Sequence, residues 1–95
     1  MFRISIFEFR ILGYMLKVLV RDREGVKFNG GAVAVSSVNA AGPFDILPGH
    51  TNFISLIRKR VSVTEAGGKK TEFNLESGVI QVLKDQVNVY LGVEM

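Results

Sequence analysis

Apolar residues alternate with polar or small ones through most of the chain after Met15, and turn residues recur at short intervals. Phe73 and Leu75, for example, are interleaved with Glu72 and Asn74. Successive side chains of a β-strand point to opposite faces, so this alternation is typical of strands with one buried face. Many short strands separated by turns predict an all-β fold, either a two-layer sandwich or a barrel.

Helical spacing of apolar residues is rare, and its best candidate is a single turn over residues 52–56. Two short turns instead predict β-hairpins, one at Gly67-Gly68 and one at Asp85-Gln86. These hairpins join residues 61–64 to 70–73 and residues 80–83 to 87–90. The alternation also predicts which side chains face inward between the layers. They are Val33, Val35, Val61, Val63, Phe73, Ile80 and Val82.

A stiff segment with two prolines runs from Gly42 to His50 and reads Gly-Pro-Phe-Asp-Ile-Leu-Pro-Gly-His. Pro43 and Pro48 fix φ and lack a backbone N–H, so the residues between them are excluded from a helix interior and from a central strand. Gly42 and Gly49 permit the dihedral angles that tight turns need. The apolar residues between the prolines are therefore expected on a short excursion, either tucked under the fold or offered to a partner.

Composition limits the class of protein without naming it. The chain has 95 residues, of which 47% are hydrophobic, enough for one domain with one modest core. It has no cysteine and a single histidine, His50, which excludes a disulfide framework and a structural zinc site. The formal net charge of +3 comes mostly from Arg58-Lys59-Arg60, Lys69-Lys70 and the pair Arg21 and Arg23. Basic clusters of this kind are usually solvated strand ends.

No apolar run reaches the ~20 residues that a transmembrane helix needs, so an integral membrane protein is not expected. Residues 1–14 are apolar but interrupted by charges, and no small-residue cleavage site follows, which argues against a signal peptide. Three interpretations of this extension are open: an added strand, an arm bound to a partner, or an upstream start with Met15 as the true first residue. We favour the last, because an exposed apolar tail invites aggregation, and we take residues 15–95 as the domain.

Several parts of the chain together resemble the epsilon subunit of F-type rotary ATP synthases, called delta in mitochondria. The segment Gly42 to His50 is similar to the family's G-E-x-G-I-L-P-G-H sequence. Residues 16–20 and 25–30 are similar to its first two strands, and residues 76–91 are similar to its last ones. The resemblance covers residues 15–93 in order and with the family's spacing.

This resemblance implies a β-sandwich of two sheets with about ten short, mostly antiparallel strands. It also implies a non-catalytic subunit without a cofactor, which couples the gamma subunit to the c-ring of a proton- or sodium-driven synthase on the cytoplasmic face of the membrane. The residues that match gamma-facing positions of the family are Asp22, His50 and Asn52. The residues that match ring-facing positions are Ala41, Gly42, Pro43 and Phe44.

The chain departs from the family at two positions and at its end. Pro43 replaces a residue that is usually acidic, and Asp45 replaces a residue that is usually glycine. After the strand at residues 87–91 the family commonly continues into two antiparallel helices, which inhibit ATP hydrolysis and in some members bind ATP, whereas this sequence stops at Met95. We therefore expect a short form that couples rotation without inhibiting hydrolysis or sensing nucleotide.

A hydrolase is one alternative class of function. His50 with Asp45 and a nearby serine has the residue types of a catalytic triad. The serines near them in the sequence are Ser36, Ser37 and Ser55. Neither a nucleophile turn nor an oxyanion-hole signature accompanies them, which disfavours this interpretation.

A small basic β-barrel that binds single-stranded nucleic acid is the second alternative. Such proteins stack bases on aromatic side chains that lie among basic residues. Here the chain has no tryptophan, and Phe28 and Phe53 stand apart from the basic clusters. We therefore expect protein partners and no nucleic acid.

Overall fold

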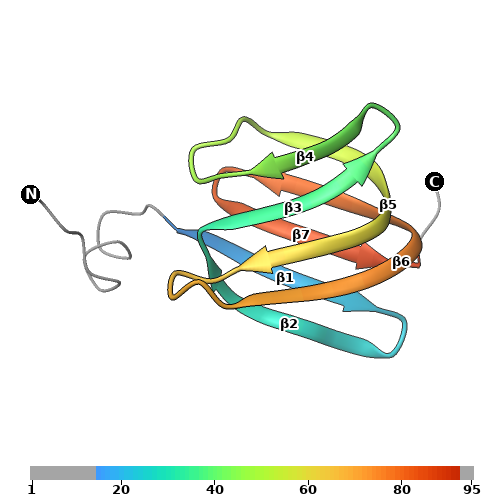
Figure 1. Cartoon of the computed structure of the whole chain (residues 1–95), viewed down its shortest axis with the longest axis horizontal. Helices are drawn as coiled ribbons and strands as arrows, with labels where there is room; N and C mark the ends of the chain where they lie inside the picture. The colour runs from blue at the N-terminus through green and yellow to red at the C-terminus, as the bar shows by residue number, and fades with distance from the viewer. Residues whose placement is uncertain (1–14, 93–95) are drawn as a thin grey trace, which may run out of the picture.

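The computed structural model describes residues 15–92 of the chain, and all regular structure in this part is β-strand. The seven strands are β1 (Leu16–Asp22), β2 (Gly25–Ala32), β3 (Ala34–Asn39), β4 (Gly42–Ile46), β5 (Phe53–Thr64), β6 (Lys70–Leu83) and β7 (Gln86–Leu91) (Figure 1). No segment of the described chain forms a helix that is able to cross a bilayer. The all-β prediction is confirmed, whereas the interpretations of residues 1–14 lie outside the described residues.

The strands form one hydrogen-bonded sheet of order β2-β1-β7-β6-β5-β3-β4, which folds over into two layers (Figure 1). β1 and β7 pair in parallel, and all other neighbours are antiparallel. The first layer holds β2, β1, β7, the C-terminal half of β6 and the N-terminal half of β5. The second layer holds the other halves of β6 and β5, then β3 and β4. The strand number is lower than predicted because β5 and β6, with 12 and 14 residues, each serve both layers.

Residues 53–56 of the best helical candidate, the turn expected over residues 52–56, belong to β5, so no helical turn forms there. Pairing with residues 79–82 of β6 fixes this segment as an extended strand. Exposure alternates along it, and Ile54 and Leu56 are 58% and 52% exposed. The segment carries apolar side chains on both faces, which produced a spacing that also fits one helical turn.

The two long strands, β5 and β6, bend where they pass from one layer to the other, and each has an unusual feature near its middle. In β5 the pairing register shifts between Ile57 and Lys59, and Lys59 has a left-handed φ of 74°. The buried Ser37 hydroxyl donates to the Arg60 carbonyl at 2.7 Å and ties β3 to this bulged part of β5. In β6 a Cβ on Gly78 would lie 2.6 Å from a carbonyl oxygen of β7, so only glycine fits without a backbone shift.

One hydrophobic core fills the space between the layers, and both layers contribute to it. Its buried members are Leu16, Val18, Val20, Ala32, Val35, Ile46, Ile57, Val61, Val63, Ile80, Val82, Val87 and Val89. All but two of the predicted inward residues belong to this core. Phe73 is half-buried and packs against it. Val33 is half-buried and not a member, because it lies at the corner between β2 and β3, where its N–H donates to the Thr64 carbonyl at 2.8 Å.

Both predicted hairpins are present. Gly68, with φ of 92°, closes the turn between β5 and β6. The turn between β6 and β7 lies at Lys84-Asp85, one residue earlier than predicted, and Lys84 adopts a left-handed φ of 56°. Pro43 lies in β4, which is the last strand of the sheet order and therefore an edge, the position in a sheet that tolerates proline.

Candidate partner-binding surfaces

The loop that carries His50 connects β4 to β5 and turns tightly. The His50 N–H donates to the Leu47 carbonyl at 3.1 Å, and Gly49 adopts φ of 87°, a conformation that glycine adopts without steric cost. The half-buried His50 ring packs edge to face against Phe53, with centroids 5.5 Å apart. Its Nδ1 lies 2.7 Å from the Thr51 carbonyl oxygen. The imidazole is therefore held in place at the surface.

Two reciprocal hydrogen bonds tie this loop to the β6–β7 turn. The Gly49 N–H donates to Asp85 Oδ1 at 2.9 Å, and the Lys84 N–H donates to Asn52 Oδ1 at 2.8 Å. The Asp85 carbonyl also accepts from the Lys17 N–H at 2.7 Å, at the start of β1. Asn52, predicted as a contact residue, thus has a structural task as well. Asp85 was missed by sequence reasoning, since no local pattern relates it to Gly49.

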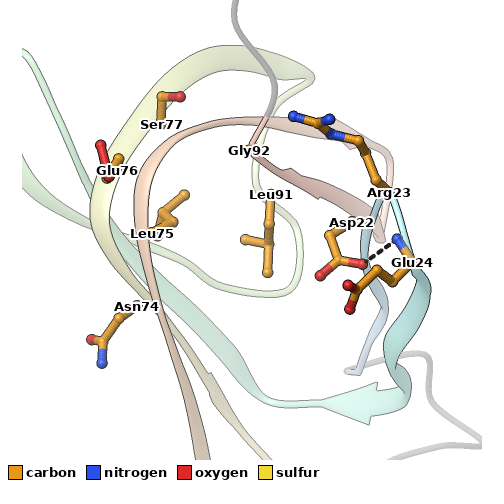
Figure 2. A pocket seen from close by; sticks show the side chains of 9 residues that line it. All are labelled: Asp22, Arg23, Glu24, Asn74, Leu75, Glu76, Ser77, Leu91 and Gly92. Atoms are coloured by element: carbon orange, nitrogen blue, oxygen red, sulfur yellow. Dashed lines mark hydrogen bonds between the residues drawn. The ribbon is translucent and has the colours of Figure 1, made fainter.

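Asp22 is the last residue of β1, at the opposite end of the strand and directly before the turn to β2. Its carboxylate accepts from the Glu24 N–H at 2.8 Å and lies 3.6 Å from Lys27 Nζ. Asp22 and Glu24 border an open hollow, and Figure 2 shows Leu91 between them and Leu75. The other lining residues are Arg23, Asn74, Glu76, Ser77 and Gly92.

The structure therefore does not bring Asp22 next to His50. β7 and β6 lie between β1 and β5 in the first layer. Lys17 at the start of β1 approaches Asp85 beside the His50 loop, whereas Asp22 ends the same strand. The gamma-facing predictions consequently fall at two diagonal corners of the first layer, and a single partner would have to cover the face between them.

That face, the outer face of the first layer, carries exposed apolar side chains among polar ones. Side chains alternate along each strand, so residues paired across the strands form rows on one face. One row joins Leu56 to Val79 and Tyr90. The next row joins Ile54, through polar residues of β6 and β7, to Leu19 of β1. Ile54 and Leu56 are more exposed than buried, whereas outward-facing residues of a solvated sheet are usually polar.

The ring-facing predictions gather on the hairpin between β3 and β4. The Ala41 N–H donates to Asn39 Oδ1 at 2.9 Å, and Gly42 has φ of 119°. Ala41 and Pro43 are exposed at the hairpin, whereas Phe44 is half-buried and packs against the core. The structure thus brings these residues together, with Phe44 as their anchor.

The residues considered for a hydrolytic triad do not assemble within residues 15–92. Ser36 donates to Asp45 Oδ1 at 2.6 Å on the outer side of the second layer. The ring nitrogen of His50 is directed to a backbone carbonyl instead. In the same part of the chain, no group of three His, Cys, Asp or Glu side chains is placed to hold a metal ion.

The aromatic residues considered for nucleic-acid binding pack against the core of the sandwich. Phe28 is half-buried and packs against the core. Phe53 does the same and also contacts the rings of Phe44 and His50. Both rings thus take part in core packing and lie apart from the basic clusters in the sequence.

Comparison with known proteins assigns the fold to a family. Residues 15–92 match the family model of the ATP synthase delta/epsilon chain, β-sandwich domain. The chain belongs to this family. The resemblance inferred from the sequence is therefore confirmed. The delta/epsilon domain accounts for all strands described above, because the match begins at Met15 and ends after β7.

Curated relatives of this delta/epsilon domain come from Helicobacter pylori. The ATP synthase epsilon chains of strains Shi470 and G27 are each 29% identical to it over 75 residues, which is 79% of this chain and 61% of the relative. The chain thus spans less than two-thirds of the length of the curated relatives it matches.

Solved structures contain the same fold. A chain in the Euglena gracilis mitochondrial ATP synthase (OSCP/F1/c-ring, rotational state 1) matches with a TM-score of 0.76 at 16% identity, over 82% of this chain and 51% of that chain. A chain in the Tetrahymena thermophila mitochondrial ATP synthase (central stalk/c-ring) matches with a TM-score of 0.65 at 8% identity, over 80% of this chain and 62% of that chain. At these identities the likeness shows the delta/epsilon fold alone.

Proposed function

We propose that this delta/epsilon domain is a non-catalytic part of the central stalk of a rotary ATP synthase, where it couples the c-ring to the gamma subunit. The observation that carries the proposal is the family match over residues 15–92. The driving ion is a proton or a sodium ion, and no cofactor is needed. The domain reaches the cytoplasmic face of the membrane as a peripheral component, through the complex.

The proposed gamma contact is the outer face of the first layer. Asp22 ends β1 at one corner of this layer, where it borders the hollow beside Leu91, and His50 with Asn52 lies at the diagonally opposite corner. The exposed side chains of Ile54 and Leu56 lie on the face between them. Apolar side chains exposed together on one face of a sheet often mark a protein interaction site.

The proposed c-ring contact is the β3–β4 hairpin, through Ala41, Gly42, Pro43 and Phe44. β4 is the edge strand of the second layer, so this contact is separate from the outer face of the first layer. Phe44 packs inward against the core and fixes the hairpin, while Ala41 and Pro43 are exposed to the partner. Two separate contact faces are what a coupling element requires.

The sandwich between these faces supplies stiffness. Its core residues come from both layers, and β5 and β6 run through both. Protein cores are packed as densely as organic crystals and deform little under load. Torque applied at the hairpin is therefore transmitted to the outer face of the first layer with little loss.

The test is assembly with purified gamma subunit and with c-ring. We expect the unaltered chain to co-purify with both. The double variant Ile54→Asp/Leu56→Asp should lose gamma and retain the ring, because it places carboxylates on the first face only. Lys70→Asp, an exposed position of β6 in the second layer, is the control and should retain both.

Two results would contradict the proposal. One is the absence of any binding by the unaltered chain to gamma and to the c-ring. The other is retention of gamma by the Ile54→Asp/Leu56→Asp variant with normal affinity, which would place the gamma contact elsewhere. Salt-sensitive retention of the chain on an oligonucleotide column, without binding to gamma, would instead favour the nucleic-acid class.

A further inference from the structure

We propose that the β6–β7 turn and the His50 loop form one composite contact surface for the gamma subunit, and that Asp85 is the positioning residue that holds it together. This inference rests on the proposed function, because gamma is the partner it names. It adds Leu83 and Lys84 to the contact and assigns Asp85 and Asn52 a role in shaping it.

The hydrogen bonds between the two segments are reciprocal. Asp85 accepts from the Gly49 N–H, and Asn52 accepts from the Lys84 N–H, so each segment supplies one side-chain acceptor and one backbone donor. The Asp85 carbonyl is bonded to Lys17 at the start of β1. Asp85 thereby fixes the His50 loop to the central strands of the first layer.

Besides these two bonds, the contacts that hold the loop are local ones, which include the packing of His50 on Phe53. Residues 47–52 lie between β4 and β5 and take part in no strand pairing. Its internal bonds join His50 to its near neighbours Leu47 and Thr51. A loop without external bonds loses conformational entropy when a partner binds, and a loop already fixed in the bound shape does not. The bonds to Asp85 and Lys84 therefore preorganise this corner.

The two segments together present apolar side chains beside a cation. Leu47 is 54% exposed and Leu83 is 49% exposed, and Lys84 is exposed next to Leu83. Leu83 continues the strand β6 that also carries Val79, so this corner is continuous with the proposed gamma face. We expect the matching surface on gamma to be an apolar recess with a carboxylate near its rim, which would pair with Lys84.

The experiment compares Asp85→Ala, Asp85→Asn and the control Asp45→Ala in binding to purified gamma. Asp45 also accepts one side-chain hydrogen bond, on the outer side of the second layer. We expect Asp85→Ala to weaken binding about tenfold, the loss of one charge-assisted hydrogen bond. Asp85→Asn keeps an acceptor oxygen and should stay within about threefold of the unaltered chain, and Asp45→Ala should not change the affinity.

Two further readouts separate positioning from general destabilisation. Amide hydrogen exchange at Gly49 and Lys84 should accelerate in Asp85→Ala, while amides of the core strands keep their protection. Lys84→Ala should weaken gamma binding about threefold at low salt and less at high salt. The ion pair proposed between Lys84 and a gamma carboxylate is exposed, and salt screens exposed ion pairs.

The outcomes are distinct. Binding by Asp85→Ala with unaltered affinity, after correction for the folded fraction, overturns the inference and leaves the proposed function intact. Equal losses in Asp85→Ala and Asp85→Asn also overturn it, since the acceptor oxygen would then be irrelevant. If the unaltered chain does not bind gamma at all, the proposed function fails first, and the inference fails with it.

Discussion

Phe44 of β4 and Phe53 of β5 meet edge to face, with ring centroids 5.6 Å apart. They lie on the side of the sandwich where the edge strands of the two layers face each other. β4 is the edge of the second layer, and the N-terminal half of β5, which pairs only with β6, is the edge of the first. No backbone ladder joins these two edges. Both rings pack against the core, so side-chain packing closes this side of the sandwich.

The aromatic contact predicts a measurable coupling. In a double-mutant cycle with Phe44→Leu and Phe53→Leu, the interaction free energy should be about 0.5–1.5 kcal/mol, typical of edge-to-face pairs. Chemical denaturation of the four proteins measures it. The pair Phe28→Leu and Phe44→Leu, which lie on strands at opposite ends of the sheet order, should be additive. An interaction free energy near zero for Phe44 and Phe53 would show that the ring contact contributes nothing beyond the burial of each ring's apolar surface.

Gly78 should resist substitution. An alanine Cβ there would lie 2.6 Å from the Tyr90 carbonyl oxygen and 2.7 Å from Leu75, so β6 and β7 would have to separate at the bend. We expect Gly78→Ala to lower the free energy of unfolding by about 2–4 kcal/mol. Gly67→Ala is the control, since no atom beyond its chain neighbours lies within 4 Å of the position that its methyl group would take. It should change stability by less than about 0.5 kcal/mol. Similar losses for both variants would contradict this account.

The buried Ser37 hydroxyl should contribute to stability through one hydrogen bond. Ser37→Ala removes the donor to the Arg60 carbonyl at the bulge of β5, which should cost about 1–3 kcal/mol. Ser36→Ala removes an exposed hydrogen bond to Asp45 and should cost less than about 0.5 kcal/mol. Thermal unfolding of both variants checks the difference. Equal stability of the two would mean that water replaces the Ser37 hydroxyl.

The two corners of the proposed gamma face should act independently. Asp22 and His50 lie at diagonal corners and share no contact, so the losses in binding free energy of Asp22→Lys and His50→Glu should add to within about 0.5 kcal/mol in the double variant. Titration calorimetry with gamma measures the three variants. A fully normal affinity for Asp22→Lys would confine the gamma contact to the His50 corner.

Much of the fold follows from local sequence. Alternation of apolar and polar residues predicts strands, and Gly67-Gly68 with Asp85-Gln86 predicts two hairpins, because both signals act between residues that are close in the chain. Pro43 restricts its segment to an edge for the same reason, since its effect on φ and on the missing N–H is local. The motif from Gly42 to His50 also led to the delta/epsilon family, whose model matches residues 15–92.

What only the tertiary structure decided depends on contacts between distant segments. The passage of β5 and β6 through both layers depends on a bulge at Lys59 and on the close approach of Gly78 to β7. The sequence pattern does not reveal this passage, because apolar and polar residues alternate in the same way in a flat strand and in a bent one. The bond from Gly49 to Asp85 forms because the sheet order brings β5 beside the β6–β7 turn. The sequence alone places Asp22 and His50 in one predicted surface. The parallel pairing of β1 with β7 sets them at opposite corners, because strand order and direction are fixed by packing of the whole core and not by any local pattern.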